Sequence, residues 1–526
     1  MHTIRLRAAL AMLFTITLCA ETHARDVWPI PNDDWPMYGH DLQHTFSKPD
    51  SPINPNNVSN LEHVWSFSTG DAVSASPSIV KGIVYVGAWD GFFYALDAHD
   101  GSLVWKFQVD CQNTVAPVPP QCLAPGQTPP DRFFTDGGLI TSSAAVVSDR
   151  VYFAAGKTFY SLNARDGALL WKRVICGNPD DPNCVSDVKD PTQIFSSPAV
   201  FDGSVFIGWT AGAVGYRGGF MALDAETGEI RWRFEVDPLL DARGVPVLTD
   251  GRVAGGINRG CGTVWSSAAI DVDNNLVFFG TGDCNNDVAP PYHDAVIALE
   301  TKTGQIRWAF RPPENGKHLC DVDFGASPNV IDSGGRQFVG IGGKDGTYYV
   351  LDRLTHNPSG SLVWSKNVVF GGSSGGFIGT AAFDGWAIFS ATSIGDGNPF
   401  AQTGLCTSDP RDTFIQEPSM HALKENDGTI LWEQIQNHSA APTSLVNGVA
   451  FSGLIGIGLL TNPDPSTGAD LPALNAYDTR TGALLWSYRM PGSVNSGATP
   501  VGDMVFVGSG NSTDGGGSAV HAFRLP

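Results

Sequence analysis

Four side chains in the middle of the sequence have the chemistry to form one site: Trp265, Asp283, Asp323 and Lys344. A tryptophan offers the largest aromatic face on which a flat, conjugated ligand can stack. Carboxylates are good oxygen ligands for a hard cation, and an ionised carboxylate can also accept a proton. A lysine ammonium can stabilise negative charge that builds up on a bound group. These residue types together predict a site that holds a planar ligand and moves a proton beside it.

The elements that must position these residues are short strands, because one motif ending in tryptophan recurs along the chain. In each copy an apolar strand such as Ala-Leu-Asp leads into a Thr-Gly or Asp-Gly turn, and the next strand ends on the tryptophan. The clearest copies are Tyr94–Trp105, Tyr160–Trp171, Met221–Trp232 and Ile297–Trp308, with a longer-turned copy over Tyr349–Trp364 and two more ending at Trp432 and Trp486. Trp265 falls outside this series.

Another strand pair precedes each motif, for example Ser76–Val80 and Gly82–Gly87, so each repeat contains four short strands. Four strands per repeat predict an all-β propeller in which the tryptophans dock between blades. Trp65 lacks the strand before it, and the segment Val520–Pro526 has that strand without a tryptophan after it. We therefore expect an eight-bladed β-propeller, its last blade made by N- and C-terminal strands. The alternative is two smaller propellers.

Composition narrows the range of partners. Hydrophobic residues make up 42% of the chain and charged residues 16%, which is typical of a well-cored globular protein. The formal net charge is −21, and no basic stretch stands out. This balance argues against nucleic acid or an anionic membrane as a partner.

The N-terminus predicts export. Arg5 and Arg7 precede an apolar run from Ala8 to Leu18, and Thr22-His-Ala24 follows as a small-x-small cleavage site. We expect a signal peptide over residues 1–24, a single propeller domain over 25–526 and, in a Gram-negative source, a periplasmic location. The apolar run is too short to span a bilayer. Cys19 raises the alternative of a lipoprotein, but Leu18 stands where a lipid signal needs a small residue.

Eight cysteines remain after such cleavage, and an even number in an exported protein favours disulfides. Cys111 with Cys122 and Cys176 with Cys184 are close enough in sequence to close local loops. The pairing of the other four stays open. The sequence has no Cys-x-x-Cys-His motif for attaching a c-type haem.

The repeated pattern Ala-x-Asp-x-x-x-Gly-x-x-x-Trp resembles the tryptophan-docking motif of the pyrroloquinoline quinone (PQQ) dehydrogenases. Three segments look most like the polyvinyl alcohol dehydrogenases of that group, and the resemblance spans the mature chain. They are Asp34-Trp-Pro-Met-Tyr-Gly-His-Asp41, Ser74-Ala-Ser-Pro77 and Gly87-Ala-Trp-Asp-Gly91. The docking motif itself also occurs in propellers that are not enzymes.

The resemblance implies roles for particular residues. In Gly262-Thr-Val-Trp265 the tryptophan matches the floor on which the quinone stacks, and Asp283 matches a calcium ligand. Asp323 matches the catalytic aspartate, which accepts the alcohol proton and also contacts calcium. Lys344 matches the cation that donates to the quinone oxygens, and Thr210 and Arg217 match cofactor-binding positions.

The chain departs from the family pattern at two acidic positions. Ala213 stands where related alcohol dehydrogenases carry a glutamate ligand to calcium, and Ser74 replaces another acidic cofactor contact. The vicinal cysteine pair that covers the cofactor in methanol dehydrogenases is also absent, although Cys111 and Cys122 lie in the matching loop. We therefore expect an atypical ligand set for any bound calcium.

These observations predict a periplasmic, PQQ-dependent oxidation of secondary alcohols, with polyvinyl alcohol as the substrate that the resemblance implies. Without a haem motif, the electrons would pass to a separate cytochrome c. One alternative is a non-catalytic propeller similar to the outer-membrane assembly lipoproteins. Another is a carbohydrate-active or lectin-like propeller, which is disfavoured because Asp321 and Asp323 are too close in sequence to flank a glycosidic bond.

Overall fold

The computed structural model describes most of the chain between residues 34 and 526, and the fold and its contacts refer to that part. The described residues are 34–110, 140–177, 192–210, 217–238, 248–249, 252–253, 263–282, 292–312, 323–369, 371–372, 375–394, 417–456, 471–510 and 517–526. Among them, no helix is both long and apolar enough to cross a membrane.

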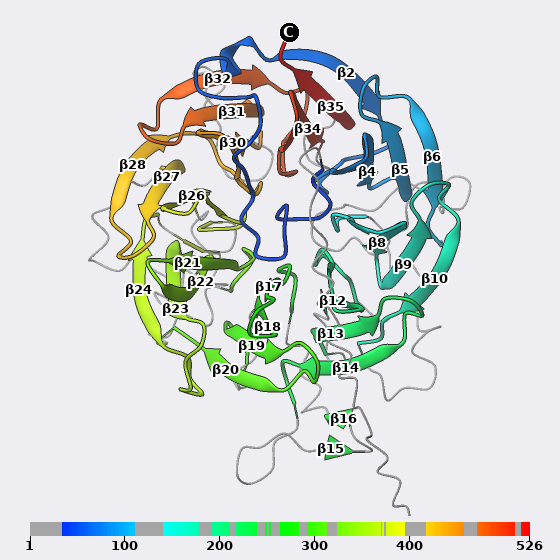
Figure 1. Cartoon of the computed structure of the whole chain (residues 1–526), viewed down its shortest axis with the longest axis vertical. Helices are drawn as coiled ribbons and strands as arrows, with labels where there is room; N and C mark the ends of the chain where they lie inside the picture. Colours follow the sequence, from blue (N-terminus) through cyan, green and yellow to red (C-terminus); the bar gives the residue numbers. More distant parts are fainter. Residues whose placement is uncertain are drawn as a thin grey trace, which may run out of the picture.

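Eight antiparallel sheets are arranged around a central channel as the blades of a propeller (Figure 1). Each blade has four strands, which run in chain order from the channel outward in blades 1 to 7, while β2 is the outermost strand of blade 8. The eight-bladed, all-β prediction is therefore confirmed. The third and fourth strands of every blade are the two halves of the tryptophan-ended motif. Their pairing carries a register shift near the tryptophan, as between Ala95 and Leu96, and such bulges increase strand twist.

The strands of the first four blades are as follows. Blade 1 is β3 (Ser78–Val80), β4 (Ile83–Gly87), β5 (Phe92–Asp97) and β6 (Leu103–Gln108); blade 2 is β7 (Ala145–Val147), β8 (Arg150–Ala155), β9 (Thr158–Asn163) and β10 (Leu169–Val174); blade 3 is β11 (Ala199–Phe201), β12 (Ser204–Trp209), β13 (Gly219–Asp224) and β14 (Ile230–Glu235); blade 4 is β17 (Ala269–Asp271), β18 (Leu276–Gly280), β19 (Val296–Glu300) and β20 (Ile306–Phe310).

The remaining elements complete the ring. Blade 5 is β21 (Asn329–Ser333), β22 (Arg336–Gly342), β23 (Thr347–Asp352) and β24 (Leu362–Asn367); blade 6 is β25 (Ala382–Phe383), β26 (Ala387–Ala391), β27 (Ser419–Lys424) and β28 (Ile430–Ile435); blade 7 is β29 (Ser444–Val446), β30 (Val449–Gly453), β31 (Ala473–Asp478) and β32 (Leu484–Arg489); blade 8 is β33 (Thr499–Val501), β34 (Met504–Ser509), β35 (Ala519–Arg524) and β2 (Glu62–Ser68). Outside the blades, β1 (Ser47–Lys48) pairs with β29, β15 (Leu248–Thr249) pairs with β16 (Arg252–Val253), and Val58–Asn60 forms a 3-10 turn.

Blade 8 combines strands from both parts of the chain, as predicted. The outer strand β2 pairs antiparallel with β35, and Trp65 on β2 lies opposite Ala522. This pairing closes the ring without leaving an open sheet edge between the first and last blades.

The blade-ending tryptophans dock on the next blade. The Nε1 of Trp105 donates to the carbonyl of Ala164, 3.0 Å away in blade 2. The indole lies against Gly167, whose φ of +72° favours glycine and whose missing side chain leaves room for the ring. The same indole-to-carbonyl bond recurs from Trp65, Trp171, Trp232, Trp308, Trp364 and Trp432. Trp486 packs instead beside Phe523 of blade 8, with ring centroids 5.3 Å apart.

Hydroxyl groups at the start of six blades form a belt around the channel. The backbone amide of Ser143 donates to the Ser197 hydroxyl at 3.0 Å, and the amide of Ser197 donates to the Ser267 hydroxyl at 2.8 Å. The same bond links one blade to the next at Ser76 to Ser143, Ser267 to Ser327, Ser327 to Thr380 and Gly497 to Ser76. Pro442 stands at the equivalent place in blade 7, where the belt is interrupted.

An N-terminal segment, residues 35–48, crosses the channel and is visible as the dark blue trace at the centre of Figure 1. It meets six of the eight innermost strands, each three residues beyond the belt position. Its carbonyls accept the amides of Ile79, Val146, Ile270, Val330, Phe383 and Leu445, which belong to blades 1, 2, 4, 5, 6 and 7. Tyr38 also bonds to the belt hydroxyl of Thr380 at 2.7 Å. The segment therefore blocks the channel beyond the belt.

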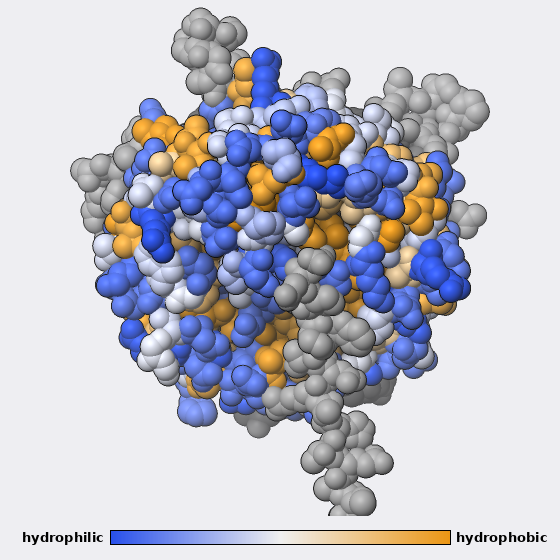
Figure 2. Space-filling view, turned by 45° about the horizontal axis from the view of Figure 1, so that its top comes forward, coloured by the Kyte–Doolittle hydropathy of each residue, from blue (hydrophilic) through white to orange (hydrophobic). Residues whose placement is uncertain are grey.

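Most of the core lies between blades, while the outer strands expose scattered apolar side chains. Figure 2 shows these apolar residues interspersed with hydrophilic ones on the face in view. The alternation is typical of a half-buried outer strand, as in β6, where Leu103 and Val104 are exposed and Trp105 is buried.

Candidate active site

The belt defines a ring of equivalent residues at the channel mouth, two positions before each belt residue. We call it the mouth ring; in blade order it consists of Ser74, Thr141, Phe195, Trp265, Gly325, Ile378, Ala440 and Asn495. Each of these residues is partly exposed between buried neighbours, except Gly325, which is buried. In blades 1 and 3–8 the residue just before the ring position donates its amide to the end of the second strand of the preceding blade. The eight positions therefore form one ring around the propeller axis.

Trp265 is the member of the mouth ring with the largest aromatic surface. Its indole extends to the equivalent position of the next blade, where Gly325 leaves the space free; a Cβ at residue 325 would clash with the six-membered ring of the indole. The Nε1 of Trp265 donates to Oδ2 of Asp323 at 2.8 Å. The indole is thus held by a close backbone approach at one end and a charged acceptor at the other.

Asp323 and Lys344 form an ion pair beside this indole. The Nζ of Lys344 lies 3.0 Å from Oδ1 of Asp323 and 5.9 Å from the centroid of the Trp265 ring. Both side chains are less than one-tenth exposed, so the pair is shielded from water. The backbone fixes the same arrangement, because the amide of Lys344 donates to the carbonyl of Asp323 at 2.9 Å. The structure therefore brings together three of the residues singled out from the sequence.

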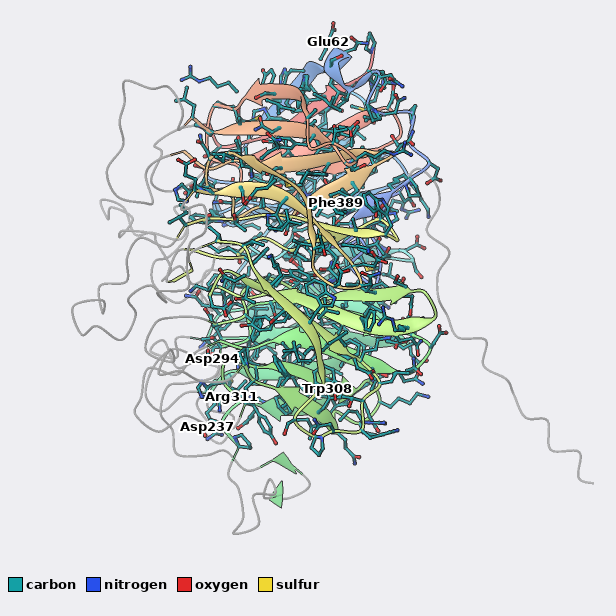
Figure 3. The ribbon with its side chains drawn as sticks, turned by 90° about the vertical axis from the view of Figure 1, so that its left-hand side faces the viewer. Glu62, Asp237, Asp294, Trp308, Arg311 and Phe389 are labelled. Atoms are coloured by element: carbon teal, nitrogen blue, oxygen red, sulfur yellow. The ribbon has the colours of Figure 1, made fainter. Side chains whose placement is uncertain are left out.

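All three residues lie on one face of the propeller for a topological reason. The segment entering the first strand of a blade and the turn between its second and third strands emerge at the same end of the antiparallel sheet. Trp265 and Asp323 lie on entering segments, and Lys344 lies in the turn between β22 and β23. Figure 3 shows Asp237, Asp294 and Arg311, which follow or precede strands at this end, on one side of the ring.

The approach to Asp283 is described although Asp283 itself lies outside the described residues. Gly282 donates its amide to the carbonyl of Thr263 at 2.7 Å. A Cβ at Gly282 would lie 2.9 Å from Oδ2 of Asp323, so the backbone passes directly beside that carboxylate. The chain thus passes beside the Asp323 carboxylate one residue before Asp283. Among the described residues, no three His, Cys, Asp or Glu side chains form a metal-binding group.

Thr210 and Arg217 are placed differently. Thr210 is buried, and its hydroxyl donates to the carbonyl of Gln193 at 3.2 Å, at the end of β12 in blade 3. Arg217 is also buried, and its Nε lies 2.8 Å from a carboxylate oxygen of Glu235 on the outer strand β14. Glu235 belongs to the outermost strand of blade 3, so this ion pair links Arg217 to the edge of its own blade.

Of the positions at which the chain departs from the family pattern, only Ser74 lies among the described residues. The Ser74 hydroxyl accepts a hydrogen bond from Nε1 of Trp89 at 2.8 Å. The Trp89 indole therefore lies beside Ser74, the position at which the family pattern has an acidic residue. Ala213 and the Cys111 and Cys122 loop lie outside the described residues. Cys176 is disulfide-bonded, and its predicted partner Cys184 is likewise outside them.

Sequence reasoning missed the mouth ring except for Ser74 and Trp265. Its signal is nevertheless present in the sequence, because the ring residue stands two positions before a small hydroxylated residue that opens most blades, as in Ser74-Ala-Ser76-Pro77 and Phe195-Ser-Ser197-Pro198. Aligning the repeats at this residue instead of at the tryptophan would have found Thr141, Phe195, Gly325 and Ile378, but not Ala440 and Asn495, which stand before Pro442 and Gly497.

Comparison with known proteins agrees with this geometry. Residues 35–363 match the family described as the β-propeller domain of glucose, ethanol and alcohol dehydrogenases that use PQQ, which is more than half of the chain. The protein belongs to this family of PQQ dehydrogenase propellers. Residues 416–522 match the family of the outer membrane protein assembly factor BamB.

Individual relatives are distant. The quinohemoprotein alcohol dehydrogenase of Comamonas testosteroni is 27% identical over 64% of the chain, but the match covers only 46% of that enzyme's length. Polyvinylalcohol dehydrogenases from Sphingopyxis sp. (strain 113P3) and Pseudomonas sp. are 24% and 23% identical over 88% and 91% of the chain, and 70% and 73% of their own lengths.

Solved structures support the fold. The Comamonas testosteroni enzyme has a TM-score of 0.67 at 21% identity and covers 94% of this chain and 80% of its own. BamB from Moraxella catarrhalis has a TM-score of 0.52 at 12% identity and covers 88% of this chain and 97% of its own. At such identities the likeness shows the propeller architecture alone.

Proposed function

We propose that the protein is a PQQ-dependent alcohol dehydrogenase that oxidises secondary alcohols to ketones, with polyvinyl alcohol as its substrate. The observation that carries this proposal is the convergence of Trp265, Asp323 and Lys344 at one mouth of the channel. The family and the two polyvinylalcohol dehydrogenases among the relatives support it.

The mouth suits a flat, anionic cofactor. Trp265 presents a partly exposed indole whose position depends on the absence of a side chain at Gly325, and Lys344 adds a cation at its edge. Trp265 and Lys344 would contact PQQ directly, and Thr210 and Arg217 would support it from blade 3. When bound, PQQ supplies the acceptor for a hydride from the alcohol carbon.

Asp323 would act as the general base. Its carboxylate takes a hydrogen bond from Trp265 and an ion pair from Lys344, and both interactions favour the ionised form that can accept a proton. The hydroxyl proton of the alcohol would pass to a carboxylate oxygen of Asp323 as hydride leaves the carbon. Lys344 would meanwhile stabilise negative charge at the edge of the indole.

Calcium fits this arrangement through Asp283 and Asp323. The described backbone at Gly282 runs beside the Asp323 carboxylate, and Asp283 is the next residue along the chain. Carboxylate oxygens are the donors that calcium prefers. With alanine at residue 213, the ligand set would contain fewer carboxylates than in related enzymes.

The proposal includes a location and an electron acceptor. The signal-peptide pattern of residues 1–24 supports a periplasmic location, and the electron acceptor in this proposal is a separate cytochrome c.

The test uses the purified full chain supplied with PQQ and Ca²⁺. We expect it to reduce an artificial dye in the presence of a secondary alcohol, and the Asp323→Asn variant to lose this activity. No dye reduction by the wild-type protein with both additions would contradict the proposal. The non-catalytic scaffold, which the BamB match over 416–522 keeps as a second candidate, would then be favoured.

A further inference from the structure

The mouth ring is chemically divided. Blades 3 to 7 contribute the aromatic or apolar residues and the glycine: Phe195, Trp265, Gly325, Ile378 and Ala440. Blades 8, 1 and 2 contribute the polar residues: Asn495, Ser74 and Thr141. A ligand that enters this mouth therefore meets hydrocarbon on one arc and hydrogen-bonding groups on the other.

Asn495 differs from Ser74, its neighbour in the polar arc. The Ser74 hydroxyl already accepts a hydrogen bond from Trp89. The side-chain carbonyl oxygen of Asn495 is buried and accepts no hydrogen bond from any described residue. A buried carbonyl oxygen without a donor is costly, and such groups in folded proteins call for an explanation. A hydroxyl group of a bound ligand would supply the missing donor.

The order of residues around the ring indicates which ligand this is. Beginning at the Asp323 carboxylate in blade 5, the next blades present Ile378, Ala440 and then Asn495. The Trp265 indole extends from blade 4 to blade 5 and reaches Asp323, and blades 6 to 8 follow Asp323 in the order of the ring. This order around the ring, a carboxylate followed by two apolar side chains and an amide, would suit an alcohol in which a short hydrocarbon segment separates two hydroxyl groups.

We propose that Asn495 accepts a hydrogen bond from a second hydroxyl of the substrate, and that Ile378 and Ala440 pack on the hydrocarbon between the two hydroxyls. This inference rests on the proposed function, because it places the reacting hydroxyl at Asp323. It assigns the substrate class as secondary diols and polyols, in preference to alcohols with a single hydroxyl. Only the hydroxyl at Asp323 reacts; the one at Asn495 positions the chain.

The experiment compares 2,4-pentanediol with 2-pentanol in the protein loaded with PQQ and Ca²⁺. For the wild type, we expect kcat/KM to favour the diol about tenfold, as one hydrogen bond to an otherwise unpaired group would give. In Asn495→Ala this preference should fall to the statistical factor of about two for two equivalent hydroxyls. Asn60→Ala, which removes an exposed asparagine outside the ring, should keep the wild-type preference.

Two further measurements separate this role from others. Quenching of tryptophan fluorescence by PQQ should give the same dissociation constant for Asn495→Ala and the wild type, and the thermal midpoint should not fall because no protein hydrogen bond to the carbonyl is lost. Ala440→Phe, which fills the apolar part of the sector, should lower kcat/KM for both alcohols at unchanged PQQ affinity.

Other results would overturn the inference. An unchanged diol preference in Asn495→Ala would do so, and so would a weaker affinity for PQQ, since the amide would then contact the cofactor. A wild-type protein that binds PQQ but prefers 2-pentanol would exclude the diol class while leaving the proposed function intact. A wild-type protein that oxidises neither alcohol would remove the proposed function itself.

Discussion

Trp265 and Gly325 occupy equivalent positions in neighbouring blades, and the indole of the first fills the space that a side chain at the second would need. The position that bears the floor residue in blade 4 is therefore left bare in blade 5. The candidate site depends on this pair of residues, because the indole could not reach the Asp323 carboxylate if blade 5 carried a side chain there.

We therefore expect Gly325→Val to weaken PQQ binding, because the added side chain would displace the Trp265 indole. Gly325 does not adopt a positive φ, so the substitution tests space and not backbone strain. Fluorescence titration with PQQ should give a dissociation constant at least tenfold larger than that of the wild type, and circular dichroism should show an intact propeller. Thr141→Val, at the equivalent position of blade 2, is the matched control and should bind PQQ nearly as well as the wild type.

Asp323→Asn should separate chemistry from binding. The amide keeps the size of the side chain but cannot accept the alcohol proton, so kcat should fall about 10²- to 10⁴-fold, the range for loss of a general base. PQQ affinity should change much less, because Trp265 and Lys344 remain. Stopped-flow reduction of the bound cofactor is the direct measurement, and a kcat within a few fold of the wild type would exclude Asp323 as the base.

Lys344→Met should weaken the cofactor site in a way that Lys344→Arg does not. The lysine is buried beside Asp323, and removing it leaves a shielded carboxylate without its cation. We expect Lys344→Met to bind PQQ at least tenfold more weakly than the wild type, and Lys344→Arg to bind it nearly as well. Fluorescence titration with PQQ measures both affinities, and equal affinities for the two variants would contradict a role for the positive charge.

The docking tryptophans should matter for stability and not for activity. Trp308 is 1% exposed and donates to the Arg353 carbonyl at 3.1 Å, so Trp308→Phe loses that bond and part of the packing. We expect a loss of about 1–3 kcal/mol in the free energy of unfolding. Trp386→Phe is the control, since Trp386 is 41% exposed and ends no blade. Denaturant titration of both variants tests this difference, and equal losses would contradict it.

Acid should destabilise the propeller through its buried histidines. Burial lowers the pKa of His421 to about 3 and that of His44 to about 4, so both stay neutral in the folded protein at pH 5. In the unfolded chain they gain protons below about pH 6.5. Because the unfolded state binds more protons, the free energy of unfolding should decrease from pH 7 toward pH 4. His421→Gln should flatten this dependence in unfolding curves measured across that range; an unaltered slope would show that His421 does not contribute.

The fold could be predicted from the sequence because it depends on local, repeated patterns. The tryptophan motif marks the outer hairpin of each blade, and the incomplete repeats at Trp65 and Val520 indicated how the ring closes; the β2–β35 pairing confirms this. The convergence of Trp265, Asp323 and Lys344 was expected only by resemblance, since residues from different blades meet through the ring geometry and not through sequence spacing.

Other parts of the site could not be predicted for physical reasons. No local pattern shows that a glycine in one blade makes room for an indole from another, or that Arg217 pairs with Glu235 on the outer strand. The mouth ring is defined by the hydroxyl belt, whose bonds join residues about 50 to 70 positions apart in most blades. Such long-range bonds become visible only when the blades are in place.

Residues 35–48 have a consequence for how the protein reaches its final state. The carbonyls of this segment accept amides from six innermost strands, the last of which belongs to blade 7. A ribosome makes this segment before any of those strands exist, so its hydrogen bonds can form only after the blades have been made and have gathered. The earliest part of the described chain to be synthesised is therefore among the last to form its hydrogen bonds. Until they form, this segment does not block the channel.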